Sequence, residues 1–236
     1  MMPIEGPVRV PDSRDDGARS PHLEPDRPRL RGVFHEIAFF VSLVSGAALV
    51  WAAPTAGSKA VGAIYAVSIS LLFGVSALLH RHSWGPVGRR RMRRADHSTI
   101  FVGIAGSYTA IAGISLGGWA RITVLCIVWG GAVVGITLRQ AWLDAPKWVI
   151  ALPYVVVGWS ALAVLPQLFH VLGVAGFVLL VGGGLAYSAG AAVYAMKRPN
   201  PLPGILGYHE IFHACTIVGA VLNFVVIAWF VLPLAS

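Results

Sequence analysis

The stretch Gly207-Tyr-His-Glu-Ile-Phe-His-Ala-Cys215 places two histidines four residues apart at the start of an apolar run that extends to about Leu232. On a helix, residues four apart share one face, with Cβ atoms about 5–6 Å apart. Two such imidazoles can bind one zinc ion if other elements supply further ligands. Because ionisable groups are rare at membrane depth, His209 and His213 predict a functional site inside a helical membrane bundle.

The composition of the whole chain indicates an integral membrane protein. Of its 236 residues, 56% are hydrophobic and 12% are charged, whereas an average soluble domain has about 25% charged residues. The mean hydropathy is +0.73. The net charge of +8 does not indicate nucleic-acid binding, because the basic residues collect between apolar runs, where they orient a membrane protein. The arginines within 89–94 are interpreted as an orientation and head-group patch.

Seven apolar runs, each near the roughly 20 residues that a spanning helix needs, predict an all-α bundle of seven transmembrane helices. The expected helices are 34–53, 60–80, 97–116, 122–138, 148–165, 171–196 and 209–232, which form one membrane domain over 33–236. Residues 1–32 contain many Pro, Asp and Arg residues and no apolar segment, which predicts a disordered tail. The sixth run, rich in Gly and Ala from 182 to 190, predicts a closely packed helix, because small residues let helices approach in lipid.

The distribution of Lys and Arg predicts the orientation. With seven helices, sixteen of the 18 basic residues fall on the side of the N-terminus, and only Lys59 and Arg121 fall on the other. The positive-inside rule therefore predicts a cytoplasmic N-terminal tail and an extracytoplasmic C-terminus in a plasma (inner) membrane.

This orientation brings the candidate site residues to one depth. Ser76 and His80 lie at the cytoplasmic end of the second helix, Asp96 at the start of the third, and His209 and His213 at the start of the seventh. Hydropathy and charge counting made no use of these residues, so their agreement in depth favours a common site near the cytoplasmic face. Agreement in depth does not make them neighbours in the membrane plane.

The chemistry of this set is that of a hydrolytic metal site. His80, His209 and His213, with water as a fourth ligand, would form an open tetrahedral zinc site. Zinc lowers the pKa of a bound water to about 7 and polarises carbonyls, which suits hydrolysis. Asp96 could hold or deprotonate the water, and Ser76 could orient His80 or bind a developing oxyanion.

Each residue also has a purely structural interpretation. Asp96 could only cap a helix, Ser76 could bond to a carbonyl of its own helix, and the three histidines could lie at the interface without a metal. His82 and His97 adjoin charged or capping positions and are expected to face water or head groups. His170 is expected on the outer side, away from the site.

In their order, these motifs resemble the hemolysin III family, within the larger group of progestin and adipoQ receptors. The members are seven-helix proteins with Ser-x3-His on the second helix, Asp at the start of the third and His-x3-His on the seventh. The corresponding stretches here are Ser76-Ala-Leu-Leu-His80, Asp96-His-Ser-Thr-Ile-Phe and His209-Glu-Ile-Phe-His213. His35 matches a histidine near the start of the first helix, whereas Ala110 stands where many members carry proline.

The resemblance spans about residues 33–233 and implies both a cofactor and an activity. It implies zinc bound by the three histidines, with a water held towards the aspartate, on the cytosolic side. It also implies hydrolysis of lipid amides, ceramide-like in the receptor branch. Bacterial members are described as cytolysins or as proteins of membrane homeostasis.

Two other functions are compatible with the sequence. His209-Glu210-x-x-His213 is also the His-Glu-x-x-His pattern of zinc proteases, in which the Glu activates water, although Glu210 points about 100° away from His209 on a helix. Alternatively, a pore former or lipid sensor without enzymatic activity could use zinc only to join helices, with Asp96 as a fourth ligand. In each case the expected partner is membrane lipid, and the sequence identifies no protein partner.

A reporter fused after Ser236 is expected to be extracytoplasmic, and one inserted in the 81–95 connection is expected to be cytoplasmic, because of the asymmetry in Lys and Arg. Reporter enzymes that are active on one side of the membrane only would measure this. The opposite result at both positions would contradict the predicted orientation and the depth of the candidate site.

Overall fold

The helices of this protein carry the apolar runs of its sequence. The computed structural model describes residues 28–142, 153–154 and 156–236. The α-helices are α1 (Val33–Ala52), α2 (Ala56–Arg81), α3 (Pro86–Ser115), α4 (Gly118–Ala141), α6 (Leu165–Met196) and α7 (Tyr208–Val226). A 3₁₀ helix, η1 (Ser160–Val164), precedes α6, and a π-helical turn, η2 (Ile227–Val231), and a 3₁₀ helix, η3 (Leu232–Ala235), follow α7. No strand occurs within the described ranges.

Among the residues that the structure describes, six helical segments are long and apolar enough to cross a membrane. One of them, Val156–Met196, has 41 residues, and Gly173 interrupts its helical geometry with a φ of 64°. The expected fifth helix, 148–165, cannot be followed as a unit, because 148–152 and 155 lie outside the described residues. The count of seven spans and the sidedness of the termini therefore stay predictions. Residues 1–27 of the expected N-terminal tail also lie outside the described residues.

The third helix begins earlier than its apolar run. The sequence predicts a start at residue 97, whereas α3 starts at Pro86, in the first turn, where proline is favoured. The arginines within 89–94 are thus helical, because arginine is a good helix former although it lowers hydropathy. Asp96 consequently lies inside α3, and the interpretation that it caps a helix is wrong.

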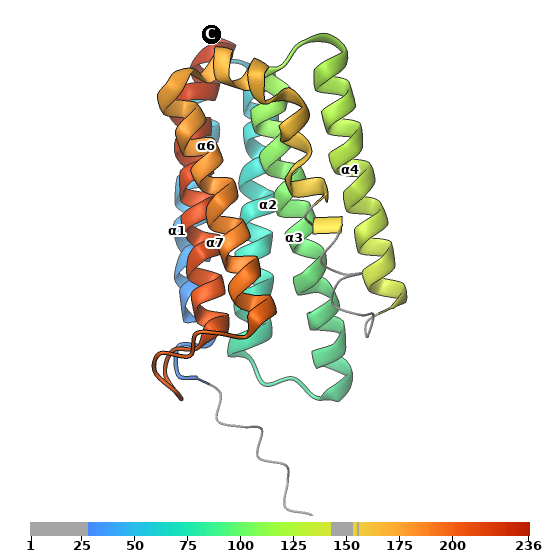
Figure 1. Cartoon of the computed structure of the whole chain (residues 1–236), viewed down its shortest axis with the longest axis vertical. Helices are drawn as coiled ribbons and strands as arrows, with labels where there is room; N and C mark the ends of the chain where they lie inside the picture. Colours follow the sequence, from blue (N-terminus) through green and yellow to red (C-terminus); the bar gives the residue numbers. More distant parts are fainter. Residues whose placement is uncertain (1–27, 143–152, 155) are drawn as a thin grey trace, which may run out of the picture.

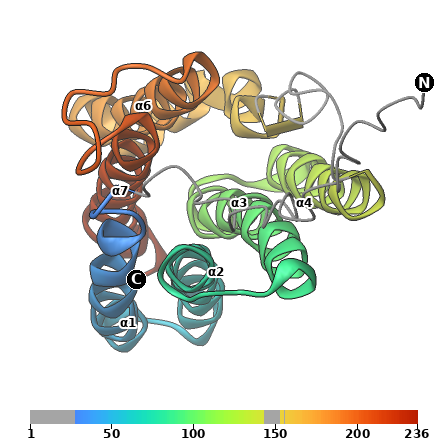
Figure 2. The ribbon, with the colours of Figure 1, turned by 90° about the horizontal axis from the view of Figure 1, so that it is seen from below.

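The helices pack side by side in an order that brings distant segments together. Seen from one end, α2 lies between α1 and α3, and α7 lies between α1 and α6 (Figure 2). The lower end in Figure 1 holds the start of α1, the end of α2, the start of α3 and the connection from α6 to α7, whereas the C-terminus lies at the opposite end. Segments about 130 and 180 residues apart in sequence therefore meet at one end of the bundle.

Glycines at seven-residue intervals let α6 approach α7 and the following turn η2 closely, as the small residues of the sixth run predict. A Cβ added to Gly176 would lie 2.9 Å from the Phe230 ring, and one added to Gly183 would lie 2.8 Å from Oδ1 of Asn223. A Cβ on Gly190 would lie 2.9 Å from Cβ of Cys215. Such a seam of small residues gives van der Waals contact where lipid supplies no hydrophobic driving force.

Replacing Gly183 by leucine is expected to lower the thermal stability of the detergent-purified protein, because overpacking of this kind costs about 1–3 kcal/mol. Gly184→Leu is the matched control, since a Cβ at Gly184 meets nothing within 4 Å and both changes improve helix propensity alike. Thermal unfolding followed by circular dichroism measures the difference. Equal stability of the two variants would contradict the packing described for α6 and α7.

Candidate metal centre

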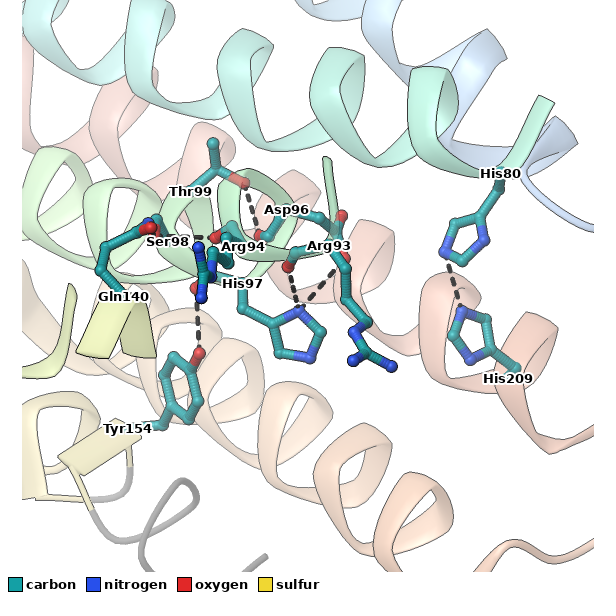
Figure 3. A network of polar contacts seen from close by, with 10 residues as sticks. All are labelled: His80, Arg93, Arg94, Asp96, His97, Ser98, Thr99, Gln140, Tyr154 and His209. Carbon is teal, nitrogen blue, oxygen red and sulfur yellow. Dashed lines mark hydrogen bonds and ion pairs between the residues drawn. The ribbon is translucent and has the colours of Figure 1, made fainter. Parts of the chain in front are cut away.

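Three of the predicted ligands lie together at the lower end of the bundle. The ring nitrogens of His80, from the last turn of α2, and of His209 and His213, from the first turns of α7, lie within 4.8 Å of one another. The Nε2 atoms of His80 and His209 are 3.1 Å apart, and the two rings point toward each other (Figure 3). Zinc–nitrogen bonds of about 2.0–2.1 Å imply ligand atoms about 3.3 Å apart. The group is therefore compact enough to bind one zinc ion.

The start of α7 is fixed by contacts of its own backbone. The Gly207 N–H donates to Oε2 of Glu210 over 2.8 Å, and the Tyr208 N–H donates to Oδ1 of Asn200 over 3.0 Å. These bonds satisfy two N–H groups that a helix start leaves without an intrahelical partner. They also fix the start of α7, and with it the helix face that His209 and His213 share. The His213 residue on this face is only 2% exposed.

Ser76 and Asp96 form a pair that joins α2 to α3. Ser76 is buried one turn before His80 on α2, and its hydroxyl is a hydrogen-bond partner of the Asp96 carboxyl on α3. It thus links two helices rather than serving only its own. Among the described residues, Asp96 does not belong to the group whose ligand atoms lie within 4.8 Å of one another. The carboxylate therefore lies outside the group of close ligand atoms, and Ser76 joins it to the helix that carries His80.

His97 differs from its expected place at the water or head-group boundary. Its side chain is 20% exposed, its Nδ1 lies 3.8 Å from the Asp96 carboxylate, and its Nδ1–H donates to the Arg93 carbonyl over 2.7 Å (Figure 3). The Tyr154 hydroxyl donates to the backbone carbonyl of His97 over 2.9 Å. His97 is consequently part of the packing around Asp96. His82 is exposed, as expected, and His170 is exposed near the start of α6, far from the cluster.

Arg139 is a residue whose role the sequence reading did not identify. It belongs to α4 and is 6% exposed, and its charge acts on the Asp96 carboxyl. In the sequence it is one of the basic residues between apolar runs, which are expected to orient the protein. A buried charge requires a partner, so Arg139 and Asp96 are complementary in this site. Arg139 directly follows the expected fourth helix, 122–138, and nothing in that position separates it from an interfacial arginine.

His35 adds a fourth imidazole to the cluster. It lies on α1, is 3% exposed, and stacks on His213 with ring centroids 3.8 Å apart and an interplanar angle of 9°. The Phe73 ring also packs against His35, with ring centroids 5.1 Å apart and an interplanar angle of 56°. The resemblance drew attention to His35 without giving it a role. In the structure it restrains the plane of the His213 ring.

Glu210 is fully buried, but it is engaged away from the histidine nitrogens. Its carboxylate accepts hydrogen bonds from Nε of Arg31 and from the Gly207 N–H. It is not a member of the group of close ligand atoms found among the described residues. A carboxylate held in this way is not free to activate a water in the manner of a His-Glu-x-x-His protease.

An apolar pocket of about 330 Å³ lies next to the start of α7. Its lining residues come from α1, α6, α7 and the connection before α7, and they are Phe34, Ala186, Leu206, Ile211, Ala214, Cys215 and Val218. No polar surface lines it, so it suits hydrocarbon rather than a polar ligand.

Comparisons with known proteins agree over the region that carries this site. A family model described as "Haemolysin-III related" matches residues 24–224. The "Hemolysin-3" of Bacillus cereus is 32% identical over 182 residues, which are 77% of this chain and 80% of that protein. The "Hemolysin-3 homolog" of Bacillus subtilis (strain 168) is 33% identical over 161 residues, which are 68% of this chain and 72% of that protein. The family match includes every residue described above for the site.

Proposed function

The chain belongs to the haemolysin III-related family. We propose that it is a zinc-dependent membrane hydrolase that cleaves lipid amides of the ceramide type. Its proposed role is in membrane homeostasis. The observation that carries the proposal is the grouping of His80, His209 and His213 within 4.8 Å. Three imidazoles with an open fourth position are a ligand set of catalytic zinc sites, whereas structural sites are usually closed by four protein ligands.

The residues around the histidines suit hydrolysis. Zinc, when bound, supplies a Lewis acid and a water acidic enough to react near neutral pH. Asp96 is the residue proposed to accept the proton of that water, since it is joined through Ser76 to the helix that carries His80 and lies outside the histidine ligand group. The Ser76 hydroxyl is a hydrogen-bond partner of the Asp96 carboxyl, and the charge of Arg139 balances that of the Asp96 carboxylate. His35 keeps the His213 ring in plane by stacking.

The position of the site supports a lipid substrate. The histidines lie where spanning helices end, so a polar head group can reach them while its chains stay in the hydrocarbon region. The apolar pocket beside α7 is the proposed place for one hydrocarbon chain. We place the protein in the plasma (inner) membrane, with the histidine end of the bundle at the cytoplasmic face.

A cytolytic function is the second candidate, because two relatives carry the names "Hemolysin-3" and "Hemolysin-3 homolog". In that case the zinc would only join α2 to α7, and no substrate would be hydrolysed. The protease alternative is less well supported, since Glu210 is already engaged by Arg31 and by the Gly207 N–H.

Asp96→Asn is expected to retain zinc and to lose the release of fatty acid from a ceramide-like amide by about 10²–10⁴-fold, the usual effect of removing a general base. Glu210→Gln, assayed with saturating zinc, is expected to keep most of its turnover, because Glu210 does not touch the reacting atoms. The measurement is fatty-acid release by detergent-purified protein, with zinc content determined on the same samples.

Each alternative predicts another pattern. A protease would lose activity in Glu210→Gln even with saturating zinc, and it would prefer a transmembrane peptide to the lipid amide. A cytolysin with structural zinc would hydrolyse neither substrate in the wild-type form, and Asp96→Asn would only lower its thermal stability. Equal hydrolysis by wild type and Asp96→Asn would contradict the role proposed for Asp96.

A further inference from the structure

Residues 29–32, here called the strap, cross the end of the bundle at which the histidines lie. The Arg29 N–H donates to the Gly204 carbonyl over 2.9 Å, and the Leu30 N–H donates to the Ile205 carbonyl over 3.3 Å. These bonds attach the segment before α1 to the connection before α7. The strap therefore links the start of the first helix to the element that presents two of the three candidate ligands.

The side chain of Arg31 fastens the strap to α7 itself. Its Nε donates to the carboxylate of Glu210, whose side chain is 0% exposed. Glu210 follows His209 directly and also accepts the Gly207 N–H. A buried carboxylate is tolerated only when it is paired and hydrogen-bonded. Arg31 thus holds the turn of α7 in which the ligand face begins.

The next residue of the strap abuts the third ligand. Gly32 is buried and has a φ of 81°, a backbone conformation that residues other than glycine rarely adopt. A Cβ at this position would lie 2.7 Å from Cβ of His80. The strap backbone can pass this close to the last turn of α2 only because Gly32 has no side chain.

We propose that Arg31 and Gly32 are positioning residues of the metal centre. Arg31 sets the place of His209 and His213 through Glu210, and Gly32 sets the place of His80 by direct backbone contact. The strap spans the gap between α2 and α7, so it fixes the separation of ligands that come from two helices. This assignment rests on the proposed zinc site, but it concerns the affinity for the metal and not the reaction.

The first test compares two glycines with left-handed backbone. Gly32→Ala strains the backbone and displaces His80, whereas Gly118→Ala strains a backbone with a φ of 55° and meets nothing within 4 Å. Zinc dissociation constants, measured by chelator competition on the detergent-purified full chain, are expected to rise about 10–100-fold for Gly32→Ala only, as for other supporting residues of metal sites. The absorption spectrum of the cobalt-substituted protein is likewise expected to change in Gly32→Ala and not in Gly118→Ala.

The second test is a double-mutant cycle across the ion pair. Arg31→Gln and Glu210→Gln are each expected to weaken zinc binding about 10–100-fold. The double variant is expected to bind zinc at least as tightly as the single variant that binds it less well, because no buried charge is then left without its partner. Arg31→Lys, which keeps the charge, is expected to bind zinc more tightly than Arg31→Gln. Glu36→Gln is the control, since its exposed ion pair with Arg81 contributes little.

The outcomes separate this inference from the proposed function. If wild type binds zinc and the Gly32, Arg31 and Glu210 variants bind it equally well, the strap is only structural and the inference is overturned, while the zinc site stands. The inference would also be overturned if the fold-changes in zinc dissociation constant of the two single variants multiplied in the double variant, because Arg31 and Glu210 would then act independently. A wild-type protein that does not bind zinc would overturn the proposed function and this inference with it.

Discussion

The close approach of the last turn of α2 to the first turns of α7 is the contact on which the account of this protein depends. It places the ring nitrogens of His80, His209 and His213 within 4.8 Å of one another in a bundle of apolar helices. Buried polar atoms need partners, and in lipid a missing partner is more unfavourable than in water. One metal ion would satisfy a nitrogen of all three rings at once, and no apolar contact could do so.

Several features of the fold serve this contact. The α6–α7 seam of glycines brings α7 close to its neighbour, and the Tyr65 hydroxyl donates to the Ala220 carbonyl over 3.3 Å, which joins α2 to α7 in the middle of the bundle. At the histidine end, the strap and the stacked ring of His35 add restraints. A site assembled from separate helices requires such support, since small displacements of one helix would move a ligand out of reach.

Much of this architecture follows from the sequence, because hydropathy and charge determine where helices cross a membrane. The all-helical membrane fold, the close packing of α6 and the membership of a haemolysin III-type family were predicted correctly, whereas the count of seven helices stays a prediction. The start of α3 was not predicted correctly, since arginines hide a helix from hydropathy. Residues that act through contacts between distant segments were also missed. Nothing local in the sequence pairs Arg31 with Glu210 or Arg139 with Asp96, and only the packed helices bring them together.

Metal analysis of the purified protein tests the central claim most directly. A three-histidine site is expected to hold about one zinc per chain, and most of this zinc is expected to be lost when any one of His80, His209 or His213 is replaced by alanine. His82→Ala and His170→Ala, which change exposed histidines outside the cluster, should retain the metal. Full retention of zinc in His80→Ala would contradict a site shared by α2 and α7, as would wild-type protein that binds no zinc.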